Sequence, residues 1–162
     1  MSERPKELEL AVALLRKQST LALATADEAG EACIAPLFYI ADDELSLFWL
    51  SSETSQHSVN LIRRSRAAVT VYRHADNWKE IRGVQMRGTV SVITDQKHRR
   101  EVVKIYCQRF KLRSVFHLAI SQCALYVFRP EFIRYIDNSR KFGSKVELVR
   151  GADGEWKRRS GK

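Results

Sequence analysis

The sequence predicts a mainly β protein with a few helices, folded into one small antiparallel barrel that is closed or partly closed. Six or more segments with strand character follow one another after a single opening helix. These strands do not alternate with long helices, so no β-α-β unit and no parallel sheet is expected. With 162 residues, of which 44% are hydrophobic, the chain is long enough for one core and too short for two ordinary domains.

The opening helix is predicted over residues 5–18, "PKELELAVALLRKQ". Pro5 suits the first helical turn, where a backbone N–H group would have no helical partner in any case. One face of the helix is apolar at helical spacing and is expected to pack on the barrel: Leu8, Val12 and Leu15.

Three strands are predicted next. Residues 20–26, "TLALATA", alternate larger and smaller side chains and lead into the turn "DEAGE". Residues 32–40, "ACIAPLFYI", and residues 44–50, "ELSLFWL", are expected to form a hairpin across the short polar connection "ADD". Pro36 cannot donate a hydrogen bond to a sheet ladder, so it is expected at an edge, at a bulge, or where the sheet opens.

A second helix is predicted over residues 54–65, and a core strand over residues 67–73. The longest strand signal covers residues 80–94. Its alternate positions separate an inner from an outer face: Val84, Met86, Val90 and Val92 inside, and Gln85, Arg87, Thr89 and Ser91 outside. Gly88 interrupts the inner face, which predicts a bulge or a close approach of two backbones.

A third helix is predicted over residues 96–110, with Asp95 as its cap. Its apolar positions are expected to be buried: Val102, Val103, Ile105, Tyr106 and Phe110. Residues 123–138 are predicted to form two strand segments that turn at Arg129 and Pro130.

The segment "KVELVRG", residues 145–151, is predicted as a last strand. Residues 1–150 are therefore assigned to a single barrel domain. Residues 151–162 are polar and basic, and we expect them to form a flexible tail.

The charge of the chain is its one unusual bulk property, with a formal net charge of +9 and a pI near 9.7. This balance suits an anionic partner, either a nucleic acid or a ligand that carries phosphate or carboxylate groups. The basic residues are spread in small groups, and no zinc finger or helix-turn-helix pattern is present. Solvated faces and ion pairs between subunits are favoured over a nucleic-acid interface.

Other classes of protein are not favoured by the composition. No apolar run approaches the length of a membrane span, and the amino end lacks the apolar core of a secretory signal. We therefore expect a cytoplasmic protein without a membrane partner. Three widely spaced cysteines without a C-x-x-C pair indicate reduced, packed side chains: Cys33, Cys107 and Cys123.

No self-contained catalytic constellation is found in the sequence. There is no G-x-S-x-G, H-E-x-x-H, G-x-G-x-x-G or P-loop pattern. A metal site formed by Cys107, His117 and Cys123 would have irregular spacing, so ordinary packing is preferred and no metal is predicted. If the protein catalyses a reaction, a bound cofactor is expected to supply the chemistry.

The order of elements resembles that of the FMN-binding split-barrel family related to pyridoxamine 5′-phosphate oxidase. The resemblance covers residues 8–137: an opening helix, the segments "ACIAPLFYI" and "ELSLFWL", the polar turn into "TSQHSVNLIRRSRAAVTV", and the strand "IRGVQMRGTV". The segments "IRGVQMRG" and "DNSRKFGSKVELVR" further resemble a small, uncharacterised bacterial subfamily. The resemblance implies a split β-barrel, FMN as cofactor, and a homodimer with the cofactor near the interface.

The resemblance also implies a set of cofactor-binding positions. The strand that runs along the flavin ring and ribityl chain corresponds to Ala35, Pro36, Leu37 and Phe38. The phosphate is expected at the end of the next strand and the start of the following helix, at Ser51, Ser52, Ser55, Gln56 and His57. The amino end of this helix would add backbone N–H donors and a partial positive charge.

His57 stands where the family often has a lysine. Its unperturbed pKa of about 6.5 makes the charge conditional, whereas a lysine is charged throughout the physiological range. A bound phosphate would favour the protonated imidazole.

Further positions are implied around the ring. Gln85 lies two residues beyond Gly83, which aligns with the glutamine that the oxidase places near the flavin. Residues bordering the site from the partner subunit are expected at Tyr135, Asp137, Asn138 and Lys145. The arginine and histidine motif with which the oxidase holds pyridoxamine phosphate is not recognisable in "YIDNSRKFGSKVEL", which argues against vitamin B6 oxidation.

The sequence thus favours a homodimeric FMN-binding protein that acts as a flavin-dependent oxidoreductase on a small-molecule substrate it does not identify. The alternative is a non-catalytic module on the same barrel that holds flavin or haem for storage or sensing. A third reading, a basic nucleic-acid-binding barrel, has one exposed aromatic and basic cluster in its favour: Tyr72, Arg73, His74 and Trp78.

Overall fold

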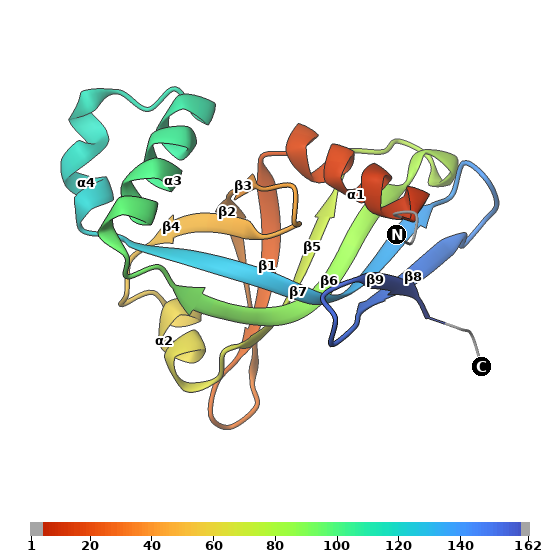
Figure 1. The fold of residues 1–162 in the computed structure, drawn as a ribbon, viewed down its shortest axis with the longest axis horizontal. Helices are drawn as coiled ribbons and strands as arrows, with labels where there is room; N and C mark the ends of the chain where they lie inside the picture. The colour runs from red at the N-terminus through yellow and green to blue at the C-terminus, as the bar shows by residue number, and fades with distance from the viewer. Residues whose placement is uncertain (1–4, 160–162) are drawn as a thin grey trace.

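The computed structural model describes residues 5–159, which form one curled antiparallel sheet with helices at its ends (Figure 1). This confirms the predicted class, a mainly β split barrel. Within these residues the strands are β1 (Thr20–Ala26), β2 (Ala32–Phe38), β3 (Ile40–Ala41), β4 (Leu47–Ser51), β5 (Arg66–Tyr72), β6 (Arg82–Val92), β7 (Ala124–Asp137), β8 (Lys145–Arg150) and β9 (Trp156–Arg158). The helices are α1 (Lys6–Lys17), α2 (Gln56–Arg63), α3 (Gln96–Arg109) and α4 (His117–Ser121), with 3₁₀ turns η1 (Trp78–Glu80) and η2 (Ser114–Phe116).

The sheet divides along its longest strand, β7. The neighbouring strands run in the order β2-β1-β5-β6-β7-β4-β3, and β8 and β9 continue from β7 in another direction. The first half of β7 pairs with β4 and the second half with β8, while β6 pairs with both halves. The barrel is therefore open between β2 and the β3–β4 side, which leaves β2 as an edge strand.

The bend in β6 and β7 lies at Gly88. The register between the two strands shifts there, because Arg87 pairs with Phe132 and Gly88 with Pro130, so that Glu131 is an extra residue. A Cβ atom on Gly88 would clash with the carbonyl oxygen of Arg129 and lie 2.9 Å from the Cα atom of Pro130. Both predicted reasons for this glycine, the bulge and the close approach, are confirmed.

The barrel interior holds the main hydrophobic core. α1 and α2 lie on opposite sides of the strands in Figure 1, and both contribute to this core. The helix side chains in it are Leu8, Ala11, Leu15 and Leu61. Trp49 and Tyr126 stack inside with ring centroids 5.8 Å apart. The predicted stripe of α1 is confirmed, although Val12 lies at its margin and Ala11 at its centre.

The predicted hairpin between residues 32–40 and 44–50 is wrong in its pairing. β2 pairs along its whole length with β1, and only Ile40 and Ala41 pair with β4. The polar turn is closed by the carboxylate of Asp42, which accepts bonds from the backbone N–H groups of Glu44 and Ser46 at 3.0 and 2.8 Å. The barrel opens at residue 39, where the chain stops pairing with β1 and crosses to pair with β4.

α3 forms as predicted. The Asp95 carboxylate accepts the N–H group of His98 at 2.7 Å and caps the helix. Val102 and Tyr106 are buried, but Ile105 is 54% exposed, which contradicts its predicted burial. The helix packs on the barrel along only one narrow stripe, and α3, η2 and α4 stand away from the barrel as a lobe (Figure 1).

The carboxyl end differs from the prediction in two ways. Within the predicted range 123–138, Ala124–Asp137 forms one continuous 14-residue strand rather than two turned segments, because the bulge at Pro130 bends the strand without ending its pairing. Part of the expected flexible tail is ordered, since Trp156–Arg158 pairs with β8 as a further strand. Arg158 also donates to the buried Glu7 carboxylate at 2.8 and 2.9 Å. Residues 160–162 of that tail lie outside the described residues.

Candidate functional site

A cluster of two serines and a histidine forms where β4 ends and α2 begins. The His57 ring nitrogen Nε2 lies 2.7 Å from Ser51 Oγ and 3.2 Å from Ser55 Oγ, and the two serine oxygens lie 3.2 Å apart. Ser55 Oγ also contacts Ser58 Oγ at 2.9 Å and donates to the Ser52 carbonyl at 2.7 Å. Sequence positions six residues apart are thus brought together, as their predicted common role requires.

The environment of His57 favours the neutral imidazole. The side chain is 8% exposed, and burial lowers its pKa below the ordinary value of 6.5. The first turn of α2 contains no acidic residue, while Ser51 and Ser55 remain partly exposed. Hydroxyl groups, an imidazole and a helix amino end are the donors that a phosphate or carboxylate uses, so this donor set fits an anionic group.

Two of the predicted phosphate residues have other partners. The Gln56 amide donates to Asn60 Oδ1 at 2.9 Å, and Asn60 donates in turn to the buried hydroxyl of Thr25 at 3.0 Å. Ser52 contacts the Thr54 hydroxyl at 2.8 Å on the exposed turn. Gln56 and Ser52 therefore hold α2 and its entry turn in place around the cluster, and their side chains are not part of its hydrogen bonds.

Arg63 and Arg64 follow the cluster in sequence but point to the other end of α2. Arg63 forms an ion pair with the Glu28 carboxylate, and Arg64 donates to the Glu28 carbonyl at 2.9 Å. Both side chains thus fasten α2 to the turn between β1 and β2. These contacts direct both guanidinium groups to Glu28 and not to the serine–histidine cluster.

The outer face of the sheet carries a second group of predicted residues. Strand pairing places Pro36, Ala22, Thr70 and Gln85 in one row across β2, β1, β5 and β6, continued by Arg134 on β7. A parallel row contains Ile34, Ala24, Ala68, Arg87 and Phe132. The expectation that Pro36 lies on an edge strand is confirmed.

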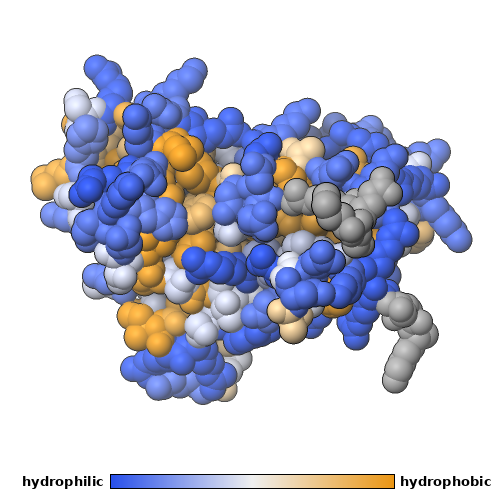
Figure 2. All heavy atoms as spheres, in the orientation of Figure 1, coloured by the Kyte–Doolittle hydropathy of each residue, from blue (hydrophilic) through white to orange (hydrophobic). Residues whose placement is uncertain are grey.

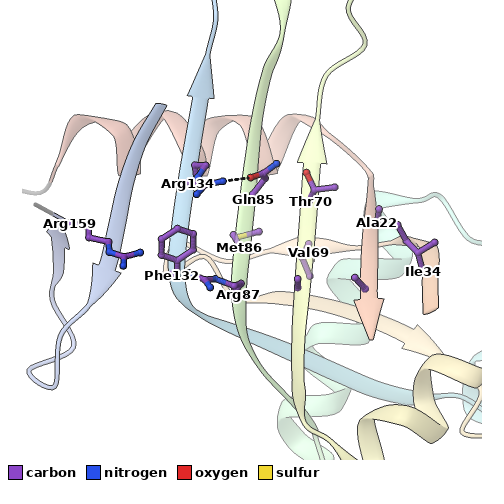
Figure 3. Close-up of a pocket in the computed structure, with 12 residues that line it drawn as sticks. Ala22, Ile34, Val69, Thr70, Gln85, Met86, Arg87, Phe132, Arg134 and Arg159 are labelled. Atoms are coloured by element: carbon purple, nitrogen blue, oxygen red, sulfur yellow. Dashed lines mark hydrogen bonds between the residues drawn. The ribbon is translucent and has the colours of Figure 1, made fainter. Parts of the chain in front are cut away.

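These rows enclose a hollow of about 520 Å³ (Figure 3). Its floor is made of small side chains, Ala22, Ala24 and Ala68, and the exposed Ile34 stands at its rim. Arg87, Arg134 and Arg159 bring positive charge to the opposite side. A sheet face with small residues at its centre leaves room for a flat group or another protein surface against the backbone.

Gln85 is held in this hollow by its neighbours. Arg134 donates to Gln85 Oε1 at 3.3 Å, the bond drawn in Figure 3, and to the Glu147 carboxylate at 2.6 Å. These hydrogen bonds from Arg134 hold the pKa of the Glu147 carboxyl below its usual value. The Gln85 amide nitrogen stays available as a donor toward the hollow.

The four predicted β2 residues divide between the two faces of the strand. Pro36 and Phe38 are exposed, whereas Ala35 and Leu37 point toward the interior and are partly buried. Phe38 contacts the ring of Phe110 on the α3 lobe with centroids 5.0 Å apart. All four lie on the open edge of the barrel, but only the backbone of β2 and its outward side chains can contact a group bound outside.

Asn138 and Lys145 lie far from the serine–histidine cluster within one chain. Ser51 pairs with the first residue of β7, whereas Asn138 follows its last residue. The Asn138 side chain is buried, donates to the Trp78 carbonyl at 3.0 Å and accepts the Gly143 N–H group at 3.2 Å. It therefore shapes the turn between β7 and β8, and Lys145 is exposed beside it.

Phe132, Arg134 and Arg159 line the hollow but were not identified from the sequence. Strict alternation from the buried Tyr126 and Phe128 would direct Phe132 inward. The bulge after Pro130 reverses the alternation, so that Ile133 and Tyr135 join the interior core, whereas the Phe132 ring packs on the outer face against the Arg87 guanidinium. Gly88 and Pro130, which pair at the register shift, are the features of the sequence that could have revealed this reversal.

Two kinds of feature, a metal-binding group and a membrane-spanning helix, are absent from residues 5–159, the part of the chain that the structure describes. This part of the chain contains no group of three or more histidine, cysteine, aspartate or glutamate side chains placed to hold a metal ion. Nor does it contain a helix of the length and apolar character needed to cross a membrane.

The comparisons with known proteins agree with this architecture. The sequence profile of the pyridoxamine 5′-phosphate oxidase family matches residues 8–137. A UPF0306 protein of Serratia proteamaculans is 28% identical over 137 residues, which cover 84% of this chain and 90% of the relative.

Two solved structures show the same fold. A pyridoxamine 5′-phosphate oxidase-related, FMN-binding protein from Nostoc punctiforme matches with a TM-score of 0.71 at 13% identity, covering 100% of this chain and 98% of that one. HutZ, described as the haem storage protein from Vibrio cholerae, matches with a TM-score of 0.64 at 21% identity, covering 80% of this chain and 92% of that one. At these identities the likeness establishes the fold and not the ligand.

Proposed function

The chain belongs to the pyridoxamine 5′-phosphate oxidase family, and we propose that it is an FMN-binding flavoprotein that transfers electrons to or from a small molecule. The observation that carries this proposal is the Ser51–Ser55–His57 cluster at the amino end of α2, whose distances of 2.7 to 3.2 Å bring three donors to one point. The FMN-binding neighbour from Nostoc punctiforme supports the choice of ligand.

In this proposal the cluster holds the phosphate of FMN. The Ser51 hydroxyl would turn from Ser55 to the phosphate, and the Ser55 hydroxyl would turn from the Ser52 carbonyl to it. His57 would donate from Nε2 as an imidazolium. The amino end of α2 adds an attraction worth about 0.3–1 kcal/mol for an exposed anion. Because no acidic side chain lies in the first helical turn, nothing there opposes the negative charge.

The outer sheet face is the proposed place for the ring. The flavin ring, when bound, supplies the electron-accepting and electron-donating chemistry. The small side chains of Ala22 and Ala24 permit close approach to the backbone of β1, and Gln85 offers an amide donor to a polar ring edge. The open edge at Pro36 leaves backbone groups of β2 without a sheet partner on one side.

We further propose that the functional unit is a homodimer. The cluster and the outer hollow share no lining residue within one chain, so a second copy would bring the cluster of one chain toward the hollow of the other. A two-fold interface uses the same patch twice, and the apolar Ile34, which is 72% exposed, suits such a patch. Asn138 and Lys145 are proposed to border the site from the partner.

The experiment that tests this proposal is FMN titration of the purified full-length protein, with the chromophore of the untreated protein identified by absorption and mass. We expect a flavin spectrum and tight binding of added FMN. His57→Ala should weaken FMN binding by at least about tenfold, which is the loss of one charge-assisted hydrogen bond worth about 1.5–3 kcal/mol. His74→Ala, at an exposed histidine outside the cluster, is the matched control.

A colourless protein that takes up no FMN would contradict the proposal. Equal FMN affinity in the His57→Ala and His74→Ala proteins would contradict the role of the cluster. Reduction of the bound flavin by a nicotinamide nucleotide, followed by reoxidation, would separate an oxidoreductase from a flavin-holding module. Vitamin B6 oxidation is not proposed, because the arginine and histidine motif of the oxidase is missing.

Haem binding is the second candidate. The observation in its favour is the shared fold with the haem storage protein from Vibrio cholerae. Arg87 would face a carboxylate of a haem in the outer hollow, and Arg134 and Arg159, which pair with Glu147, would have to share their charge with a second carboxylate. The same titration distinguishes the two ligands, because haem gives an intense Soret band and its binding would depend on the arginines of the hollow and not on His57.

A further inference from the structure

The α3–η2–α4 lobe contains a hollow that the proposed flavin site does not use. α3 and α4 lie side by side in Figure 1 and border an open hollow of about 670 Å³, a volume in the range of small-molecule sites. The lining comes from residues 96–108 of α3 and residues 117–121 of α4. Figure 2 shows apolar atoms surrounded by hydrophilic ones over this lobe.

The hollow is amphipathic because α3 contributes two different stripes to it. Val103 and Cys107 are four residues apart and therefore share one face of the helix, where they form an apolar wall with Ile120 of α4. Arg100 and Lys104 share the neighbouring face and line the same hollow. Polar side chains of Gln96, Gln108, His117 and Ser121 complete the rim.

Within residues 5–159, the cations of this hollow have no anionic partner. Residues 96–122 contain seven lysines and arginines and one carboxylate, Glu101. None of the ion pairs within residues 5–159 involves this segment. Arg100 and Lys104 are like charges at helical spacing, which destabilises an isolated helix. No acidic side chain lines the hollow.

Arg99 has a different role from its neighbour Arg100. Its guanidinium donates to the carbonyl oxygens of Ile120 and Cys123 at 3.2 and 2.9 Å. These bonds fasten the carboxyl end of α4 to α3 and keep the hollow between the two helices. Arg100 and Lys104 are thus the cations left to meet a ligand.

We propose that this hollow binds a long-chain carboxylate of the fatty-acid class. The carboxylate lies against Arg100 and Lys104, and the hydrocarbon chain covers Val103, Cys107 and Ile120. Charge complementarity selects an anion, and the apolar wall selects one with a hydrocarbon body. An inorganic phosphate or a nucleic-acid backbone would use the cations and leave the wall exposed, while a neutral lipid would leave the cations without a partner.

The test is displacement of a fluorescent fatty-acid probe from the full-length protein, below the micelle concentration of each competitor. Hexadecanoate and its methyl ester have the same chain and differ only in charge. We expect hexadecanoate to bind at least about tenfold more tightly than the ester, because charge-assisted hydrogen bonds reach only the carboxylate. Shortening the chain from sixteen to eight carbons should weaken both ligands.

Paired variants separate charge from packing. Arg100→Gln with Lys104→Gln should remove the preference for the carboxylate and leave the ester unchanged. Lys79→Gln with Lys141→Gln removes the same charge from exposed positions in η1 and in the turn between β7 and β8, and should change the binding of neither the acid nor the ester. Ile120→Ser should weaken acid and ester alike. The thermal unfolding temperature of each variant shows whether it is folded. If Ile120→Ser is destabilised, the comparison of the two double variants that remove charge still tests the proposal.

Three results of the displacement assay would overturn the proposal, and a fourth would assign the lobe to another ligand. The three are equal binding of acid and ester, equal effects of the two charge-removing pairs, and failure of hexadecanoate to displace the probe. Tighter binding to anionic phospholipid vesicles or to DNA than to free hexadecanoate would assign the lobe to a membrane surface or a nucleic acid instead. The lobe hollow shares no lining residue with the outer hollow or with the Ser51–Ser55–His57 cluster, so the outcome of these assays is independent of the proposed flavin site.

Discussion

His57 gives the proposed phosphate site a charge that depends on pH. Burial lowers the pKa of the free imidazole below 6.5, so the unliganded protein carries it neutral at neutral pH. Its hydrogen bond with Ser51 at 2.7 Å fits either tautomer, since a hydroxyl can donate or accept. A phosphate beside the ring would raise the pKa again, because the anion stabilises the protonated form.

FMN affinity is therefore expected to rise as the pH falls from 8.5 to 6.5. Binding is coupled to proton uptake wherever the pKa of His57 is higher in the complex than in the free protein, and lower pH then favours the complex. The trend should stop near pH 6, where the phosphate dianion itself gains a proton and becomes a monoanion. Fluorescence titration at three pH values measures it.

His57→Lys serves as the comparison for this pH effect. A lysine is charged throughout this pH range, so the variant should bind FMN with little dependence on pH. The His57→Ala variant should bind FMN weakly, and its affinity should depend equally little on pH. A wild-type profile that is as flat as those of both variants would show that His57 does not titrate against the ligand.

At the scale of single elements, the β6–β7 bulge determines which side chains reach the outer face. The Gly88→Ala variant is expected to lose about 3 kcal/mol or more of unfolding free energy, at the upper end of overpacking costs. Its Cβ atom would meet backbone atoms of Arg129 and Pro130, which cannot rotate away. Urea denaturation followed by circular dichroism measures the loss.

Gly83→Ala is the matched control on the same strand. Its Cβ atom would lie 3.2 Å from the Tyr72 Cβ atom and from the Val71 carbonyl, a contact that a small shift can relieve. Alanine also gains about 0.5–1 kcal/mol over glycine in a strand through lower chain entropy. Equal losses in the two variants would mean that the bulge is not a site of close backbone approach.

An ion pair between Glu7 and Arg158 links α1 to β9. Burial alone would raise the pKa of the Glu7 carboxyl, but hydrogen bonds from Arg158 and the charges of Arg158 and Arg140 lower it below 4.5. A carboxyl with a lowered folded-state pKa adds stability above its unfolded-state pKa, and this stability disappears as the pH falls through the folded-state value.

Glu7→Gln should lower the unfolding free energy by about 1–3 kcal/mol at pH 7, the range for hydrogen bonds to charged groups. The difference from wild type should shrink as the pH falls below about 4.5. Glu44→Gln removes an exposed carboxylate 3.7 Å from Arg150 and should change stability by less than about 1 kcal/mol. If the difference in unfolding free energy between Glu7→Gln and wild type stays constant down to pH 3, this result would contradict the assigned ion pair.

Local signals were sufficient for the elements whose causes are local. The Asp95 cap fixes the start of α3, and Gly88 marks the bulge, so both could be predicted from the sequence. The pairing of β2 could not be predicted from the sequence, because its alternating residues suit either β1 or β4 as a partner. Closure of the barrel decides between them, and that closure involves residues far away in the sequence.

The same limit applies to the candidate site. Ser51, Ser55 and His57 are near in sequence, so their spacing and the family resemblance were enough to place them together. The lining of the outer hollow depends on the register of five strands and on the reversal after Pro130. A side chain such as Phe132 could be assigned to that face only once the long-range pairing was known.

At the scale of the whole molecule, an exposed sheet face with alanines at its centre is typical of a surface that packs against a partner. Ala24 lies between Ile34 and Ala68 in the outer rows, and these side chains leave the β1 backbone accessible. Soluble monomers rarely expose a large contiguous apolar patch, and such patches mark interfaces. The proposed homodimer would bury this face in both copies.

Ala24→Glu is expected to convert the proposed dimer to a monomer and to release FMN with it. The substitution would bury an unpaired carboxylate at about 3–5 kcal/mol, which raises the dimer dissociation constant about a hundredfold or more. Sedimentation velocity over a range of protein concentrations measures assembly, and absorbance of the sedimenting species reports retained flavin. Ala13→Glu, on an exposed position of α1, carries the same charge and should leave both unchanged. A dimer that survives Ala24→Glu would place the interface on another face, while a monomer that keeps its FMN would confine the whole flavin site to one chain.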